Sequence, residues 1–127
     1  MAGESAYVAE TVQAAWDNHL AAFGSQDVEK ILLDYSEDCV ITTYDLGKDE
    51  KTVFKGVEEV RACFTSIFAS MPDTSDLSLP SCDVSEEGKM IFIVWRCPAS
   101  GYVDASDTFV FGGDNKIRFQ NVVFKKV

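Results

Sequence analysis

The sequence predicts an α+β fold, in which a curved, mostly antiparallel β-sheet wraps around three helices from the N-terminal half of the chain. Two observations predict it. Apolar residues with helical spacing occur before residue 72, whereas β-branched and alternating patterns dominate from residue 77 onward. The expected element order is α-α-β-β-α-β-β-β-β. The 127 residues are expected to form one domain, residues 1–127, with a conical cavity between the sheet and the helices.

The first helix is predicted over residues 4–24, where one face is apolar. At about 100° per residue, the side chains of this face fall within an arc of about 100°: Val8, Val12, Ala15, Trp16, His19 and Phe23. Gly24 is expected to end the helix, as a C-terminal glycine commonly does.

Two more helices follow. Asp27 is expected to cap a short second helix that continues to Tyr35. Gly56 opens a third helix with acidic residues in its first turn, and Pro72 ends it. Its apolar positions have helical spacing: Val57, Val60, Phe64, Ile67 and Phe68.

The strands are predicted from β-branched or alternating runs bounded by turn residues. Pro80 interrupts one of them, which is therefore expected at an edge of the sheet. The expected strands are 39–44, 52–55, 77–84, 90–97, 102–111 and 116–124.

Strand 90–97, MIFIVWRC, is apolar on both faces. One face can pack on the helices, so the other needs a cover as well. Because no further helices remain, a second copy of the chain is the simplest cover, and we expect a homodimer through the outer face of the sheet.

The charge and the ends of the chain limit the possible partners. Eleven basic and 21 acidic residues give a net charge of −10. Nucleic acids and anionic membranes both require a basic surface, so neither is expected as a partner. The sequence shows no secretory signal and no apolar run long enough to span a bilayer, which favours a cytoplasmic protein.

The four cysteines have no CxxC spacing, and the chain has one histidine, so neither a zinc site nor any other metal or cofactor site is predicted. Most of the cysteines lie in apolar surroundings, which indicates buried, reduced thiols, with a disulfide pair as the alternative.

Two polar residues occupy positions where apolar ones are expected. His19 lies within the apolar stripe of the first helix. Asp107 is expected on the strand face that also carries Val103, Ala105, Phe109 and Phe111. A buried imidazole and a buried carboxyl group in one small domain indicate a pocket capable of acid/base chemistry.

Three stretches of the sequence resemble the nuclear transport factor 2-like superfamily, with its SnoaL-like and ketosteroid-isomerase-like branches nearest. They are HLAAFGSQDVEKILLDYSEDCVI (19–41), FKGVEEVRACF (54–64) and SDTFVFGGDNKIRFQNVVF (106–124), and the resemblance extends from about residue 8 to 124. This resemblance implies the cone-shaped α+β fold described above. It says less about function, because isomerases, dehydratases, cyclases, epoxide hydrolases and binding modules share the fold.

Ketosteroid isomerases use a carboxylate base and an oxyanion hole made of a tyrosine and a protonated aspartic acid. The resemblance places Asp107 at the position of that aspartic acid and His19 at the position of the tyrosine. Thr43 stands where the base would be, and a threonine cannot remove a proton from carbon. Ketosteroid isomerase activity itself is therefore not expected.

Two roles are open for Asp107. Burial raises the pKa of a carboxyl group, so Asp107 could remain protonated and donate a hydrogen bond. Alternatively it could be ionised and orient His19, which would then act as the base. A structural role, with Asp107 bonded to the backbone or to Arg96, is the third interpretation. Asp45, two residues after Thr43, either replaces the missing base or is a solvated turn residue.

The expected ligand is a hydrophobic small molecule. The pocket is predicted to be lined by Trp16, Tyr35, Thr43, Phe64, Phe68, Trp95, Phe109 and Phe111, although such residues can also be plain core. Three functions remain open: an isomerase, dehydratase or cyclase that acts on a carbonyl-bearing compound through His19 and Asp107, a ligand carrier without catalysis, and a dimeric protein-interaction module.

Overall fold

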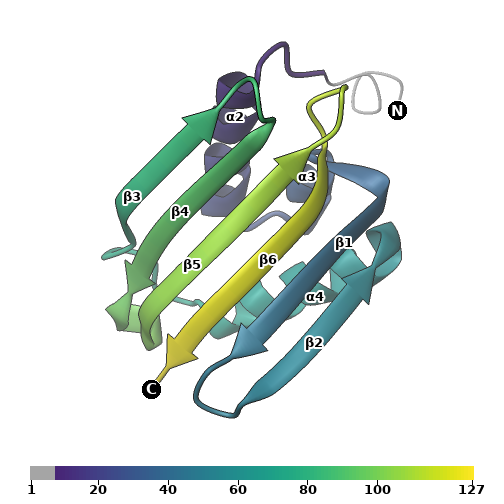
Figure 1. Ribbon diagram of the computed structural model, residues 1–127. Helices are drawn as coiled ribbons and strands as arrows, with labels where there is room; N and C mark the ends of the chain where they lie inside the picture. Colours follow the sequence, from purple (N-terminus) through teal and green to yellow (C-terminus); the bar gives the residue numbers. More distant parts are fainter. Residues whose placement is uncertain (1–7) are drawn as a thin grey trace.

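The computed structural model describes residues 8–127 and contains one curved, open, six-stranded sheet with all of its longer helices on one face (Figure 1). The expected α+β class and element order are confirmed. The elements are α2 (Val12–Ser25), α3 (Val28–Leu32), β1 (Tyr35–Asp45), β2 (Glu50–Lys55), α4 (Gly56–Ser70), β3 (Ser78–Ser85), β4 (Met90–Cys97), the short 3₁₀ helix η1 (Pro98–Ser100), β5 (Tyr102–Phe111) and β6 (Ile117–Lys126).

The boundaries of α2 differ from the prediction. Part of the predicted segment, residues 4–7, lies outside the described residues. The helix begins at Val12 because the Thr11 side chain accepts a hydrogen bond from the Ala14 amide. Glu86, from the turn between β3 and β4, also accepts hydrogen bonds from the amides of Val12 and Gln13. The predicted end at Gly24 is wrong by one residue, since Ser25 is still helical.

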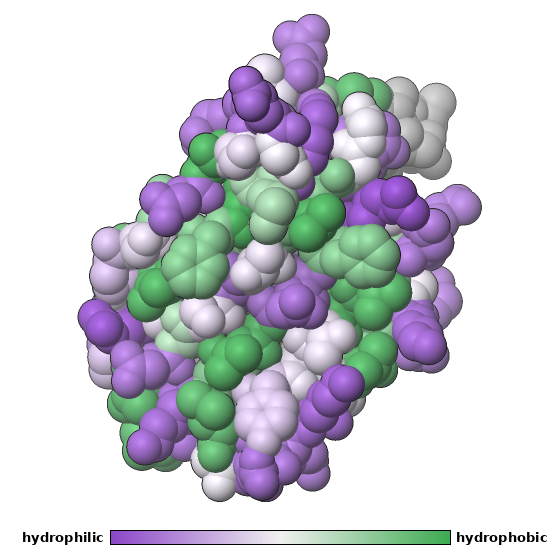
Figure 2. All heavy atoms as spheres, in the orientation of Figure 1, coloured by the Kyte–Doolittle hydropathy of each residue, from purple (hydrophilic) through white to green (hydrophobic). Residues whose placement is uncertain are grey.

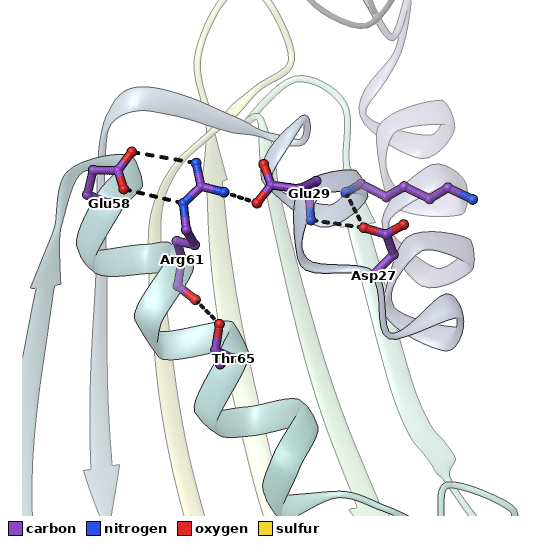
Figure 3. A network of polar contacts seen from close by, with 6 residues as sticks. Asp27, Glu29, Glu58, Arg61 and Thr65 are labelled. Carbon is purple, nitrogen blue, oxygen red and sulfur yellow. Dashed lines mark hydrogen bonds and ion pairs between the residues drawn. The ribbon is translucent and has the colours of Figure 1, made fainter.

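The short helix α3 is stabilised by a cap at its N-terminus and by an ion pair with α4. Asp27 caps it as predicted, with its carboxylate accepting from the amides of Glu29 and Lys30 (Figure 3). The side chain of Arg61 on α4 forms ion pairs with Glu29 and with Glu58, which ties α3 to α4. The helix stops at Leu32, so the expectation that it reaches Tyr35 is wrong: Tyr35 is the first residue of β1.

The strand order is β2-β1-β6-β5-β4-β3. Only β1 and β6 run parallel, and every other neighbouring pair is antiparallel, as the sequence predicted for most of the sheet. The strand that contains Pro80 lies at one edge. The parallel pair brings the start of β1 beside the start of β6, and this places Tyr35 next to Ile117 and Asp45 next to Phe124.

The core lies between the inner face of the sheet and α2 and α4. Residues of β4 and β5 alternate, so that Ile91 and Ile93 on β4 and Phe109 on β5 are buried toward the helices. The largest fully buried side chains from the helices include Phe64 and Ile31. This packing leaves a hollow farther along the sheet, which forms the candidate site.

The outer face of the sheet is not covered within this chain. Met90 and Phe92 on β4 are each 42% exposed, and Phe119 on β6 is 49% exposed. Figure 2 shows hydrophobic residues (green) among polar ones across this face. Strand β4 is apolar on both faces for this reason: the side chains of one face lie in the core, and those of the other face lie on the outer surface of the sheet.

All four cysteines are free thiols; Cys39, Cys63 and Cys97 are buried and Cys82 is exposed. The predicted alternative of a disulfide pair is thus wrong. In the stretch from residue 8 to the C-terminus, no helix has the length and apolar character needed to cross a membrane.

Candidate functional site

A cavity of about 380 Å³ lies between the helices and the inner face of the sheet. This volume falls within the range of small-molecule sites. Most of its wall is apolar, with contributions from α2, α4 and every strand from β1 to β6. A few polar side chains interrupt that wall, notably His19 on the helix side and Asp107 and Gln120 on the sheet side.

His19 lies in the wall of the cavity and is only 4% exposed. Its Nδ1 is 3.0 Å from Oδ2 of Asp34, a buried residue in the link between α3 and β1. The Nδ2 group of Asn18 donates a hydrogen bond of 2.8 Å to the other oxygen, Oδ1, of Asp34. Asp34 does not line the cavity, so it contacts His19 from behind.

This contact determines which nitrogen of the neutral imidazole carries the hydrogen. Nδ1 must donate to the carboxylate of Asp34, so Nε2 is left with its lone pair. Within residues 8–127, no hydrogen-bond partner occupies Nε2. Every fully buried side-chain nitrogen or oxygen of this range has a partner, so Nε2 is not fully buried, and His19 lines the cavity.

Aromatic rings hold the imidazole on its remaining sides. Trp16 stacks on it with ring centroids 5.6 Å apart, and Phe109 meets it edge to face at 5.4 Å. Tyr35 makes a similar edge contact at 5.9 Å. These contacts and the bond to Asp34 restrict rotation of the ring, so the lone pair of Nε2 keeps a defined direction.

Asp107 faces the cavity from β5 and accepts two hydrogen bonds. Trp95 Nε1 donates to Oδ1 at 2.8 Å, and Gln120 Nε2 donates to Oδ2 at 2.9 Å. Burial raises the pKa of this carboxyl group from 3.8 to about 6, because desolvation outweighs the effects that lower it: the two hydrogen bonds and the positive charge that His19 carries when it is protonated. The carboxylate is thus the main form at pH 7, with a protonated fraction that grows below it.

Gln120 is itself held by Tyr35, whose hydroxyl group donates to its Oε1. This bond turns the amide group of Gln120 toward Asp107. Burial raises the pKa of Tyr35 well above its usual value, so its hydroxyl remains a donor throughout the accessible pH range. Tyr35, Gln120 and Asp107 thereby form one chain of hydrogen bonds across β1, β6 and β5.

The structure places the other predicted pocket residues in two groups. Trp16, Thr43, Phe64, Trp95 and Phe109 line the cavity. The remaining three, Tyr35, Phe68 and Phe111, are buried in the core and do not line it. Asp45 lies at the edge of the cavity, while its Oδ1 accepts from the amides of Gly47 and Lys48, as in a turn.

One of the alternatives left open by the sequence, in which Asp107 orients His19, does not occur. The carboxylate that contacts His19 is Asp34, and no hydrogen bond joins His19 to Asp107. The alternative partner of Asp107, Arg96, pairs with Asp104 on the surface. Asp107 is therefore free of the orienting role, because Asp34 performs it.

Sequence reasoning missed Asp34 and Gln120. Asp34 lies within the segment predicted to be the short second helix, where an aspartate resembles a solvated surface residue. Gln120 gave a clearer signal, since it occupies an inward position of a strand whose other inward residues, Val122 and Phe124, are apolar.

Across the described range, no group of three or more His, Cys, Asp or Glu side chains is arranged to hold a metal ion.

No family model matches the sequence, and no curated protein matches it. Solved structures do resemble the fold. A SnoaL-like protein of unknown function from Burkholderia thailandensis E264 has a TM-score of 0.69 at 16% identity, over 89% of this chain and 92% of that one. The epoxide hydrolase/cyclase-like enzyme SalBIII, which has a role in pyran ring formation in the polyether salinomycin, has a TM-score of 0.68 at 17% identity, over 89% of each chain.

An NTF-2 like protein of unknown function from Burkholderia xenovorans LB400 has a TM-score of 0.60 at 11% identity, over 91% of this chain and 84% of that one. The chain has the SnoaL-like, nuclear transport factor 2-like fold. At such identities the likeness concerns the fold, so the function must be argued from the cavity and its residues.

Proposed function

We propose that this SnoaL-like protein is an enzyme that transfers protons within a hydrophobic, carbonyl-bearing small molecule, as an isomerase, dehydratase or cyclase does. The observation that carries the proposal is the His19–Asp34 pair. His19 lines an apolar cavity, and a buried carboxylate contacts its Nδ1 at 3.0 Å, which leaves Nε2 as the nitrogen available to a ligand.

In the simplest reaction, His19 Nε2 removes a proton from the carbon next to the substrate carbonyl, and the electron pair moves to the carbonyl oxygen. The resulting imidazolium is stabilised by Asp34 and by the bond that Asn18 donates to the same carboxylate. In a substrate with a β,γ double bond, return of the proton to the γ carbon leaves the double bond conjugated with the carbonyl group and completes an isomerisation. In a substrate with a β hydroxyl group, delivery of the proton to that group releases water while the electron pair forms the new carbon–carbon double bond. Neither route needs a co-reactant.

Asp107 supplies a second acid/base group on the opposite wall. Its pKa of about 6 is close enough to neutrality that it can accept a proton from the substrate or return one. One carboxyl group cannot both donate a proton and orient His19 as a carboxylate. Here Asp34 orients His19, so Asp107 remains available as the proton donor. This division supports catalysis over a plain binding pocket.

A generic base-sensitive compound tests the proposal without knowledge of the natural substrate. The probe 5-nitrobenzisoxazole is small and apolar, and removal of its C3 proton breaks the N–O bond to give a coloured phenolate. The wild-type protein is expected to accelerate this reaction, and His19→Gln should lower the rate about a hundredfold or more. Asp17→Asn, an exposed change on the same helix, is the matched control and should leave the rate unchanged.

The same samples distinguish the other two functions. If an apolar fluorescent dye binds in the cavity but no turnover depends on His19, the protein is a carrier. If neither binding nor turnover occurs in a protein with a native circular dichroism spectrum, the interaction module is favoured. Each of these results overturns the enzymatic proposal.

We also infer that two copies of the chain pair through the outer face of the sheet. The support is the exposure of Met90, Phe92 and Phe119 on that face, since exposed apolar groups of this size commonly mark an interface. Sedimentation velocity should show a dimer for the wild type and a monomer for Phe119→Glu. Leu46→Glu, an exposed apolar position in the β1–β2 turn, should remain dimeric. A monomeric wild type would contradict the inference.

A further inference from the structure

Two lysines lie at the end of the cavity opposite His19. Lys48 comes from the turn between β1 and β2, and Lys126 is the last residue of β6. His19 contacts Asp34 and Tyr35 at the start of β1, which lies beside Ile117 at the start of β6. The ring of His19 also packs on Phe109, which pairs with Gln120 of β6. The six-residue step from Gln120 to Lys126 corresponds to roughly 20 Å of strand at ~3.3 Å per residue.

The side chain of Lys126 is directed along the cavity wall. Its Nζ lies 5.3 Å from the centroid of the Tyr102 ring, a contact between a cation and an aromatic face. The hydroxyl group of Tyr102 is in turn 2.8 Å from Oγ of Ser70. Tyr102 and Ser70 both line the cavity, so the ammonium group and two hydroxyl groups are gathered at this end.

No carboxylate among residues 8–127 forms an ion pair with Lys48 or Lys126. Asp45 lies close by and lowers the positive potential, but one of its oxygens is already engaged by two turn amides. Among the charged side chains that line this end of the cavity, two are cations and one is an anion. This local excess stands out in a chain with 21 acidic and 11 basic residues.

Between the two ends, the wall of the cavity is mainly apolar. Ile67 on α4, Trp95 on β4 and Val122 and Phe124 on β6 separate the acid/base groups from the lysines. A ligand that matches this pattern has a hydrophobic body and an anionic group at one end only.

We propose that the cavity binds an amphipathic organic acid, with its carboxylate at Lys48 and Lys126 and its hydrophobic body extended toward His19. This inference rests on the proposed function and names its substrate class: a hydrophobic carboxylic acid whose reacting carbonyl or hydroxyl group is remote from the carboxylate. The lysines attract the acid electrostatically and hold it in one orientation, so the reacting atoms face His19 and Asp107.

Competition binding tests the proposal. A neutral fluorescent dye, 1-aminoanthracene, is displaced from the wild-type protein at pH 8 by decanoate or by decanol, its uncharged counterpart. Decanoate is expected to bind more tightly. Lys48→Gln and Lys126→Gln should each weaken decanoate about two- to fivefold and leave decanol unchanged, and in the double variant the two ligands should bind alike. Lys51→Gln removes an equal charge outside the cavity and should have no effect.

Salt gives an independent readout, because added salt should weaken decanoate and not decanol. Equal affinity of the two ligands in the wild type, or equal loss in Lys51→Gln, overturns the anionic site. That result leaves the enzymatic proposal intact, since turnover of uncharged 5-nitrobenzisoxazole does not require the lysines. Conversely, selective decanoate binding together with turnover that is insensitive to His19→Gln overturns the enzymatic proposal alone.

Discussion

Two buried aspartates, one behind His19 and one in the sheet wall of the cavity, have different neighbours. Asp34, behind α2, contacts a group that can become a cation, His19, and an amide group of Asn18. Asp107, on the sheet, receives hydrogen bonds only from the neutral side chains of Trp95 and Gln120. Asp34 is closed off from the cavity, whereas Asp107 lines it.

This difference teaches how one residue type can serve two purposes in a small domain. A carboxylate with an ionisable partner orients that partner and stabilises its charge. A carboxylate with neutral donors remains partly desolvated, and its pKa rises toward the pH at which it can exchange protons. Four substitutions would sharpen or break this contrast, and they follow in order of decreasing effect.

Removal of the Asp34 carboxylate should have the largest effect on stability. Asp34→Ala leaves the buried Nδ1 of His19 and the half-buried amide group of Asn18 without their acceptor, and is expected to lower the free energy of unfolding by about 2–4 kcal/mol. Asp34→Asn should cost less, because its amide oxygen still accepts from His19. Urea denaturation measures both, with Asp17→Asn as the exposed control. Equal stability of Asp34→Ala and the wild type would contradict the role of the pair.

The charge of Asp107 should make stability fall as the pH rises. Its pKa is about 6 in the folded protein and near 3.8 in the unfolded chain, so between these values the folded state binds more protons. The contribution of this group to the free energy of unfolding is fully present below about pH 4 and is lost above about pH 6. The change is about 3 kcal/mol, at ~1.4 kcal/mol per unit of pKa difference.

Asp107→Asn removes this titration. Urea denaturation at pH 4 and at pH 7 gives the free energy of unfolding of the wild type and of Asp107→Asn. The wild-type value minus the variant value should therefore decrease by up to about 3 kcal/mol from pH 4 to pH 7. Contributions from the other carboxyl groups cancel in the difference. Parallel pH profiles for the two proteins would show that Asp107 titrates normally.

Loss of one neutral donor should raise the pKa of Asp107 further. Trp95→Phe removes the hydrogen bond to Oδ1, which holds that pKa down, and an upward shift of about one unit is expected, since a bond to a charged group is worth ~1.5 kcal/mol or more. Carbon-13 NMR of the aspartate carboxyl groups measures it. Trp16→Phe keeps both donors to Asp107 and should show a smaller shift.

The smallest effect is expected from Tyr35→Phe. This change removes the donor to Gln120 and leaves the buried amide oxygen without its partner, for a loss of about 1 kcal/mol. Tyr44→Phe, at a partly exposed position on the same strand, is the control and should stay within about 0.5 kcal/mol of the wild type. A larger loss in Tyr44→Phe than in Tyr35→Phe would contradict the hydrogen-bond chain.

The sequence by itself determined the α+β class, the order of the elements and the inward position of His19 and Asp107. These features depend on local periodicity: every third or fourth residue of a helix and every second residue of a strand share one face. The edge position of the Pro80 strand and the cap at Asp27 were predictable for the same reason, because backbone chemistry acts over a few residues.

Only the tertiary structure decided which carboxylate meets His19. Asp34 is 15 positions away in the chain, and the packing of α2 against the link between α3 and β1 brings the two together. The same holds for Gln120 and Tyr35, which are 85 positions apart and meet because β1 and β6 pair in parallel. Side-chain pairing across the fold depends on register and packing distance, and no periodicity in the sequence encodes either of them.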